Sequence, residues 1–202
     1  MEQIPKQEKP ISSEEFFNEK IEVHNVSKEE FLEFMKLMNP KDSEEDILQR
    51  KGENFDLEGK TYIFLRNDVF PKEYLPYLET HEKWEAYIAR RDGYNLWQKT
   101  LREYQKDKKV DLSDKKAEDD FGKELGIYNY DFRHEYAIYK EYQHAMIDGK
   151  LEEYYKWFMD LREKEKISAN EKNLKLIEND TKIRKSIYKK LKEGTKHSFQ
   201  RN

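Results

Sequence analysis

Two short segments place metal-binding side chains at helical spacing. In "HEKWE", residues 81–85, His81 and Glu85 are four residues apart. On a helix, residues at this spacing lie one turn apart on the same side. An imidazole nitrogen and a carboxylate oxygen can then both reach one divalent ion at about 2.0–2.2 Å. Glu82 lies about 100° further round the helix and would flank such an ion, where it could polarise a bound water molecule.

The pattern around HEKWE predicts that both side chains are buried. On a helical wheel, His81 and Glu85 share a face with Tyr74, Leu78 and Ile88. A buried carboxylate is costly unless it has a cation, a proton or several hydrogen-bond donors. Glu85 therefore needs a partner. A metal ion would serve, and a hydrogen-bonded pair inside the core is the other interpretation of the same residues.

A second segment, "HEYAIYKE", residues 134–141, repeats the pattern. His134 and Glu141 share a helical face with Ile138 and Ala145. Three of the five histidines fall in or beside the two segments, as a site assembled between two helices would require. Glu141 and His144 also form a Glu-x-x-His pair, the spacing of di-iron helical bundles, but such bundles need a second copy and the sequence holds one.

The order of a strand, a loop with proline and the helix "ETHEKWEAY" resembles the zincin metallopeptidases over roughly residues 55–93. In that family, two helix residues bind zinc and the glutamate between them is the general base. The resemblance implies that His81 and Glu85 are zinc ligands and that Glu82 is the base. It also implies that the strand "TYIFLR" aligns a peptide or protein substrate along its edge.

Zincins take their third ligand from a later helix. We predict His134 for this role, with Glu135 and Glu141 as alternatives. Glu85 stands where zincins have a second histidine, and its charge would reduce the power of the ion to acidify water. The resemblance thus implies a zinc-dependent peptide hydrolase or a non-catalytic relative of one.

The elements around the motif predict an α+β fold that is predominantly helical. "NFDLEGKTYIFLR" predicts a β-hairpin at about 53–67, because β-prone residues flank a Glu-Gly-Lys turn. The motif helix should follow it directly, starting near Pro76 and ending at "RRDG". A later helix is expected from about 131 to 147, and Ser27 with Glu30 predicts a capping box at the start of an earlier one.

Composition limits the class of protein. The chain has 202 residues, of which 41% are charged and 14% aromatic, and this aromatic content indicates a folded core. It has no cysteine, which excludes disulfides and thiolate zinc sites. No stretch is apolar enough for a signal peptide or a membrane span, so we expect a cytoplasmic protein.

Charge divides the chain into an acidic body and a basic tail. Residues 161–202 hold 13 Lys or Arg and 6 Asp or Glu, whereas the rest hold 26 and 37. We predict a disordered lead at 1–11, one mainly helical domain at 12–166 and a basic helical tail at 167–202. A polar connector at 106–120 has no assigned role. Six cations of the tail could bind an acidic partner or nucleic acid: Lys182, Arg184, Lys185, Lys189, Lys190 and Lys192.

A second class of function fits the same residues. The protein could be a non-enzymatic helical interaction module whose buried His and Glu side chains are polar contacts within the core. In that case, the charged surface or the basic tail would dock the partner, and removing His81 would cost the same stability with or without metal.

Overall fold

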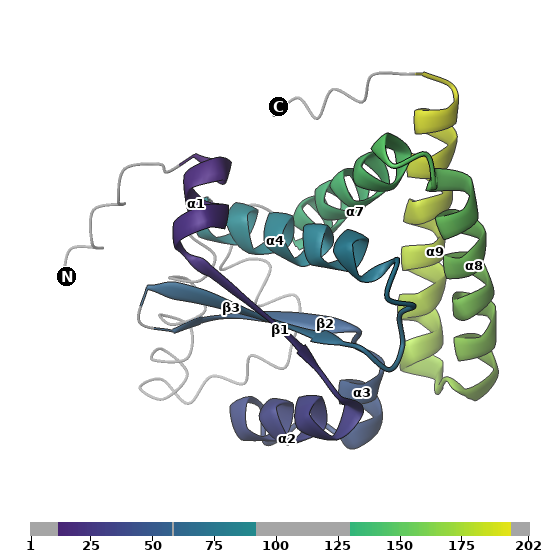
Figure 1. Cartoon of the computed structure of the whole chain (residues 1–202). Helices are drawn as coiled ribbons and strands as arrows, with labels where there is room; N and C mark the ends of the chain where they lie inside the picture. Colours follow the sequence, from purple (N-terminus) through teal and green to yellow (C-terminus); the bar gives the residue numbers. More distant parts are fainter. Residues whose placement is uncertain (1–11, 58, 92–129, 195–202) are drawn as a thin grey trace, which may run out of the picture.

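The computed structural model describes residues 12–57, 59–91 and 130–194, and it confirms the predicted α+β class (Figure 1). A small sheet precedes the motif helix, and helices make up most of the rest. The predictions for 1–11 and 106–120 lie outside the described residues. The elements in chain order are α1 (Ser13–Glu19), β1 (Ile21–Val26), α2 (Lys28–Met38), α3 (Glu44–Leu48), β2 (Gly52–Leu57), β3 (Lys60–Arg66), α4 (Leu75–Arg91), α7 (Tyr130–Ile147), α8 (Leu151–Ser168) and α9 (Glu171–Lys192).

The three described strands form a mixed sheet in the order β1-β3-β2. β2 and β3 form the predicted hairpin, with Gly59 in the turn at a φ of 82°. β1 pairs with β3 in parallel, with Ile21 opposite Thr61. β3 is therefore the central strand, and the prediction that "TYIFLR" offers a free edge to a substrate is wrong. Segment 21–26 was not predicted to be a strand, and its parallel pairing with β3 fills that edge.

Local capping fixes several boundaries. The capping box predicted at Ser27 and Glu30 is present, with each side chain bonded to the backbone N–H of the other residue. Ser12, Ser43 and Asn170 accept backbone N–H groups at the starts of α1, α3 and α9. Between α7 and α8 the chain turns at Gly149, whose φ of 72° suits glycine. This turn brings α8 back against α7.

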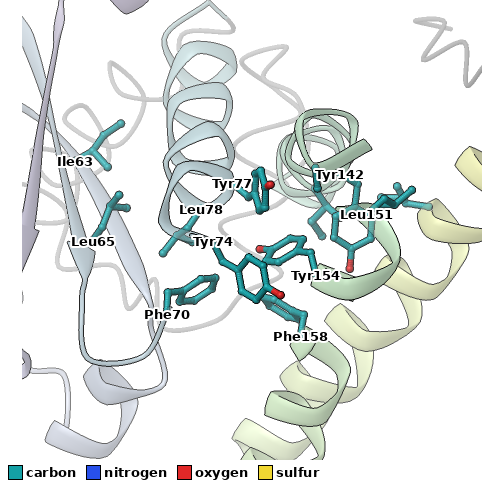
Figure 2. Close-up of a cluster of buried hydrophobic side chains, with 13 residues drawn as sticks. Ile63, Leu65, Phe70, Tyr74, Tyr77, Leu78, Tyr142, Leu151, Tyr154 and Phe158 are labelled. Atoms are coloured by element: carbon teal, nitrogen blue, oxygen red, sulfur yellow. The ribbon is translucent and has the colours of Figure 1, made fainter. Parts of the chain in front are cut away.

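The main core lies between the sheet, α4, α7 and α8 (Figure 2). Ile63 and Leu65 of β3 face α4 and are fully buried. Buried tyrosines from three helices fill the centre, and their rings pack at centroid distances such as 4.9 Å between Tyr77 and Tyr154. Two of these hydroxyls reach carboxylates: Tyr77 donates to Asp148 at 3.1 Å and Tyr154 to Glu141 at 2.6 Å. Among the described residues, the buried hydroxyl of Tyr142 has no hydrogen-bond partner.

A smaller cluster covers the other face of the sheet. Phe31 and Met35 of α2 and Ile47 of α3 are fully buried there. Phe34 stacks on Phe64 of β3, with ring centroids 4.0 Å apart. The sheet is thus held between α4 on one side and the α2–α3 pair on the other (Figure 1).

Helix α9 forms most of the described part of the predicted basic tail. It lies beside α8 and contacts α7 (Figure 1). Ile177 and Ile187 are buried on its inner face, whereas Lys182, Lys185 and Lys189 are exposed on its outer face. The division of the chain at residue 166 stays a prediction. Among the described helices, none combines the length and apolar character needed to cross a membrane, and the cytoplasmic location stays a prediction.

Candidate metal centre

The helices α4 and α7 bring the three predicted metal ligands together. His81 and Glu85 project from α4, and His134 projects from α7, which packs along α4. One ligand atom from each of the three lies within 4.8 Å of the others. His81 and Glu85 are buried and His134 is partly buried. Of the alternatives for the third ligand, neither Glu135 nor Glu141 belongs to this group.

Each imidazole directs one nitrogen toward Glu85. Nε2 of His81 lies 3.4 Å from Oε2 of Glu85, and Nδ1 of His134 lies 3.7 Å from Oε1. Since Oε1 and Oε2 belong to one carboxylate, this group stands between the two rings. The rings themselves meet edge to face, with centroids 4.9 Å apart. Two nitrogens and a carboxylate thus converge on one small volume.

The other nitrogen of each imidazole is held by a second carboxylate. Nδ1 of His81 lies 2.9 Å from Oε2 of Glu141, and Nε2 of His134 lies 3.0 Å from Oδ1 of Asp180. A carboxylate at this position favours a donating N–H on the nitrogen it contacts. When the imidazole is neutral, the nitrogen that faces Glu85 is then the one that carries the lone pair. Metal-binding histidines in proteins are commonly oriented by such an outer carboxylate.

Arg184 of α9 closes these contacts into a ring. Its Nη1 donates to Oε1 of Glu141 at 2.6 Å, and its Nε lies 3.1 Å from Oδ2 of Asp180. Each of the three helices contributes two residues to the closed cycle. We refer to this set as the charged ring, and its members in order are His81, Glu141, Arg184, Asp180, His134 and Glu85.

The charged ring strongly shifts the ionisation of its members. Burial alone would lower the pKa of His81, but hydrogen bonds to Glu141 and Glu85 outweigh it and raise the pKa to about 10. Burial would raise the pKa of Glu141, but Arg184 and His81 hold it at about 2. The pKa of Asp180 is likewise well below its usual value, because two arginines and His134 outweigh its burial. The side chains of the ring by themselves therefore hold protonated His81 between carboxylates.

Glu85 is the member of the charged ring with the weakest hydrogen bonding. Among the described residues, no group donates a hydrogen bond to its Oε1, which is buried. The two imidazole nitrogens that face it lie at 3.4 and 3.7 Å, both beyond ordinary hydrogen-bond length. A buried carboxylate oxygen without a donor favours a cation as its partner.

Glu82, the predicted general base, lies between α4 and the sheet. It is buried, and Nδ2 of Asn54 on β2 donates to its Oε2 at 3.0 Å. Its Oε1 lies against Gly52, where a Cβ would come within 2.7 Å of it. Burial raises its pKa to about 8, and the neighbouring carboxylates of Glu85 and Glu53 add to the rise. Glu82 thus follows the proposed ligand His81 on α4, yet its side chain is hydrogen-bonded to Asn54 of β2.

Two residues of the centre were not predicted as part of it. No role was predicted for Asp180, and Arg184 was predicted to be a surface cation for an acidic partner or nucleic acid. That prediction is wrong for Arg184, which is 3% exposed and bonded to Glu141 and Asp180. The available signal was spacing, since both residues fall on the face of α9 that carries Ile177 and Ile187.

His144 takes no part in the centre. Its Nδ1 lies 2.7 Å from the hydroxyl of Thr80, and its side chain is 37% exposed. The Glu-x-x-His spacing with Glu141 therefore does not bring these two side chains to one ion in this structure. Glu141 instead serves His81, Arg184 and the hydroxyl of Tyr154.

Comparisons of the chain with protein-family models, with curated proteins and with solved structures find no match. The resemblance to zincins therefore stays a prediction. What the described residues establish is a buried group of His81, Glu85 and His134 that could hold a metal ion.

Proposed function

We propose that this protein binds one divalent metal ion, zinc, through Nε2 of His81, the carboxylate of Glu85 and Nδ1 of His134. One observation carries the proposal: the three ligand atoms converge within 4.8 Å while the far nitrogen of each imidazole contacts a carboxylate. A chance cluster of polar side chains would not require this division of each imidazole into an inner and an outer nitrogen.

The spacing of the ligand atoms supports a tetrahedral ion. Ligand atoms about 2.1 Å from a tetrahedral zinc ion lie about 3.4 Å from one another. The two nitrogen-to-oxygen distances around Glu85 are 3.4 and 3.7 Å. These two distances end on different oxygens of Glu85, and one ligand atom from each residue lies within 4.8 Å of the others, so an ion would draw the three side chains closer together.

The donor set favours zinc over calcium or magnesium. Calcium and magnesium prefer oxygen ligands in larger numbers, whereas imidazole nitrogens suit zinc and its transition-metal neighbours. Two His and one Glu form a ligand set known in zinc hydrolases, where a fourth position is open to water or substrate. Each imidazole must be unprotonated at the nitrogen that binds the ion, so affinity should fall at acid pH.

The finer form of this proposal is a zincin-like peptide hydrolase. A bound zinc ion would supply Lewis acidity and a water of lowered pKa. Glu82 would be the general base, and its burial beside His81 supports this role. Because β3 is central, a peptide substrate could pair only with β1 or β2 of the described sheet. We expect Glu82→Gln to abolish hydrolysis and spare metal binding; hydrolysis that survives this change would rule out Glu82 as the base.

One observation favours a second candidate, the non-enzymatic interaction module. All six members of the charged ring contact their neighbours in the ring at 4 Å or less. The same ring could therefore be a structural ion-pair network that joins three helices. An acidic partner or nucleic acid would then bind the exposed lysines on the outer face of α9, and substitution of Lys182, Lys185 and Lys189 would flatten the salt dependence of binding.

Elemental analysis of the purified protein, free of any tag, would separate the two candidates. The parent is measured beside His81→Ala, Glu85→Ala and His24→Ala. His24 is the matched control, since it is a partly exposed histidine on β1 and lies outside the charged ring. The metal proposal predicts near-stoichiometric zinc in the parent and in His24→Ala, and loss of zinc in the other two variants.

Unfolding with and without zinc gives a second readout. Free zinc at 100 times its dissociation constant should stabilise the parent by about 2.7 kcal/mol, because it binds the native state alone. The two ligand variants should not respond. If zinc and chelator leave the parent unchanged, and His81→Ala costs the same stability in both, the charged ring is a structural network and the metal proposal is wrong.

A further inference from the structure

Asp180 is bound from several sides by cationic side chains. Its Oδ1 lies 3.0 Å from Nε2 of His134, and its Oδ2 accepts from Nε of Arg162 at 2.8 Å. Nε of Arg184 lies 3.1 Å from Oδ2 as well. The residue is 7% exposed. Asp180 is thus a buried, ionised carboxylate whose position is fixed by Arg162 on the neighbouring helix α8 and by Arg184 one turn along α9.

This fixed carboxylate determines how His134 is presented to Glu85. With Nε2 directed at Asp180, the opposite nitrogen, Nδ1, faces the carboxylate of Glu85 at 3.7 Å. A carboxylate partner favours a proton on Nε2, which leaves the lone pair on Nδ1. His134 lies on α7 and Asp180 on α9, so the orientation of one proposed ligand depends on a helix that supplies no ligand.

The two outer carboxylates are not equivalent. Glu141 orients His81 from α7, a helix that already carries the ligand His134. Asp180 orients His134 from α9, which packs against α7 and α8 rather than α4. A metal ion between α4 and α7 would therefore be linked to α9 through the His134–Asp180 and Glu141–Arg184 pairs.

From these contacts, we infer that Asp180 is the residue that positions His134 for metal binding, and that metal binding in turn holds α9 in its docked position. This inference rests on the proposed metal site. Linkage requires the two effects to be reciprocal: if docked α9 strengthens metal binding, then bound metal stabilises docked α9 by the same factor.

Zinc affinity of the full chain tests the positioning role. Zinc dissociation constants are measured by competition with a chromophoric chelator for the parent, Asp180→Asn and Glu178→Gln. Glu178 is the matched control, an exposed carboxylate on the same helix two residues away. We expect Asp180→Asn to weaken zinc binding 10- to 100-fold, the usual effect of losing an outer-shell partner, and Glu178→Gln to change it less than twofold. Absorption of the cobalt-substituted proteins should show an altered ligand field only in Asp180→Asn.

Hydrogen exchange of the parent tests whether bound metal stabilises the docked position of α9, and this measurement needs no variant. Zinc should slow amide exchange in α9, at 171–192, as well as in α4 and α7. If zinc protects α4 and α7 but not α9, or if Asp180→Asn binds zinc as tightly as the parent, the inference is wrong while the proposed metal site stands. If the parent binds no zinc, both are wrong.

Discussion

Arg184→Met should be among the most destabilising single substitutions in the described chain, because it removes one cation that serves two buried carboxylates. Arg184 is 3% exposed, and its guanidinium reaches Oε1 of Glu141 at 2.6 Å and Oδ2 of Asp180 at 3.1 Å. It also lies over the ring of Phe158, 3.8 Å from the centroid. Methionine can fill the volume of the side chain but supplies neither charge nor donors.

The expected loss of stability depends on the hydrogen-bond partners that the two carboxylates retain in the variant. Glu141 retains Tyr154 and His81, and Asp180 retains partners on other helices, so neither is left bare. A hydrogen bond to a charged group contributes about 1.5–3 kcal/mol, and breaking one side of a buried ion pair costs about 3–5 kcal/mol. We expect a loss of about 4 kcal/mol. With an m-value near 2 kcal/mol/M, the urea midpoint should fall by about 2 M.

The assay is urea unfolding followed by tryptophan fluorescence, in chelator so that metal makes no contribution. Lys185→Met is the control, because Lys185 is the exposed neighbour on the same helix and should change stability by no more than about 0.5 kcal/mol. Adding Glu141→Gln to Arg184→Met should restore part of the loss, since one buried charge is removed. A loss below about 1 kcal/mol for Arg184→Met would refute the view that Arg184 holds the charged ring together.

Two further predictions concern residues beside the centre. Gly52→Ala should cost about 1–2 kcal/mol in urea unfolding, since the new Cβ would lie 2.7 Å from Oε1 of Glu82, and the cost should shrink in a Glu82→Ala background; equal costs in both backgrounds would contradict the contact. Burial, aided by Arg162, lowers the pKa of Lys51 to about 8. Between pH 8 and 10.5 the folded state therefore binds fewer protons than the unfolded state. The free energy of unfolding should rise with pH in this range, by up to about 1.4 kcal/mol per pH unit. Lys51→Met should remove this gain, so parallel pH profiles for parent and variant would count against it.

The parts of the fold that the sequence predicts are those set by local spacing. The hairpin at 52–66 and the motif helix follow from β-prone residues around a turn and from apolar residues at helical spacing. The strand at 21–26 could not be predicted in the same way. Its residues, "IEVHNV", become a strand through parallel pairing with β3, a partner 40 residues away in the chain.

In the candidate centre, too, the sequence predicted only the residues that local spacing indicates. His81 and Glu85 are one helical turn apart, and their apolar neighbours indicated that both are buried. Asp180 and Arg184 have the same spacing. However, a charged side chain on an apolar helix face can be buried only if oppositely charged or hydrogen-bonding partners lie on other helices. Those partners lie on α7 and α8, 18 to 46 residues earlier in the chain, and no local pattern reveals them.

The charged ring also constrains the order in which the molecule can mature during translation. The helices that carry His81 and His134 leave the ribosome before α9, and domains fold as their segments emerge. Until Asp180 and Arg184 have been made, Glu141 has no arginine and His134 has no outer carboxylate. The nascent chain must therefore keep these groups hydrated and the α4–α7 interface open. The interior around the charged ring can become dry only after α9 has been made.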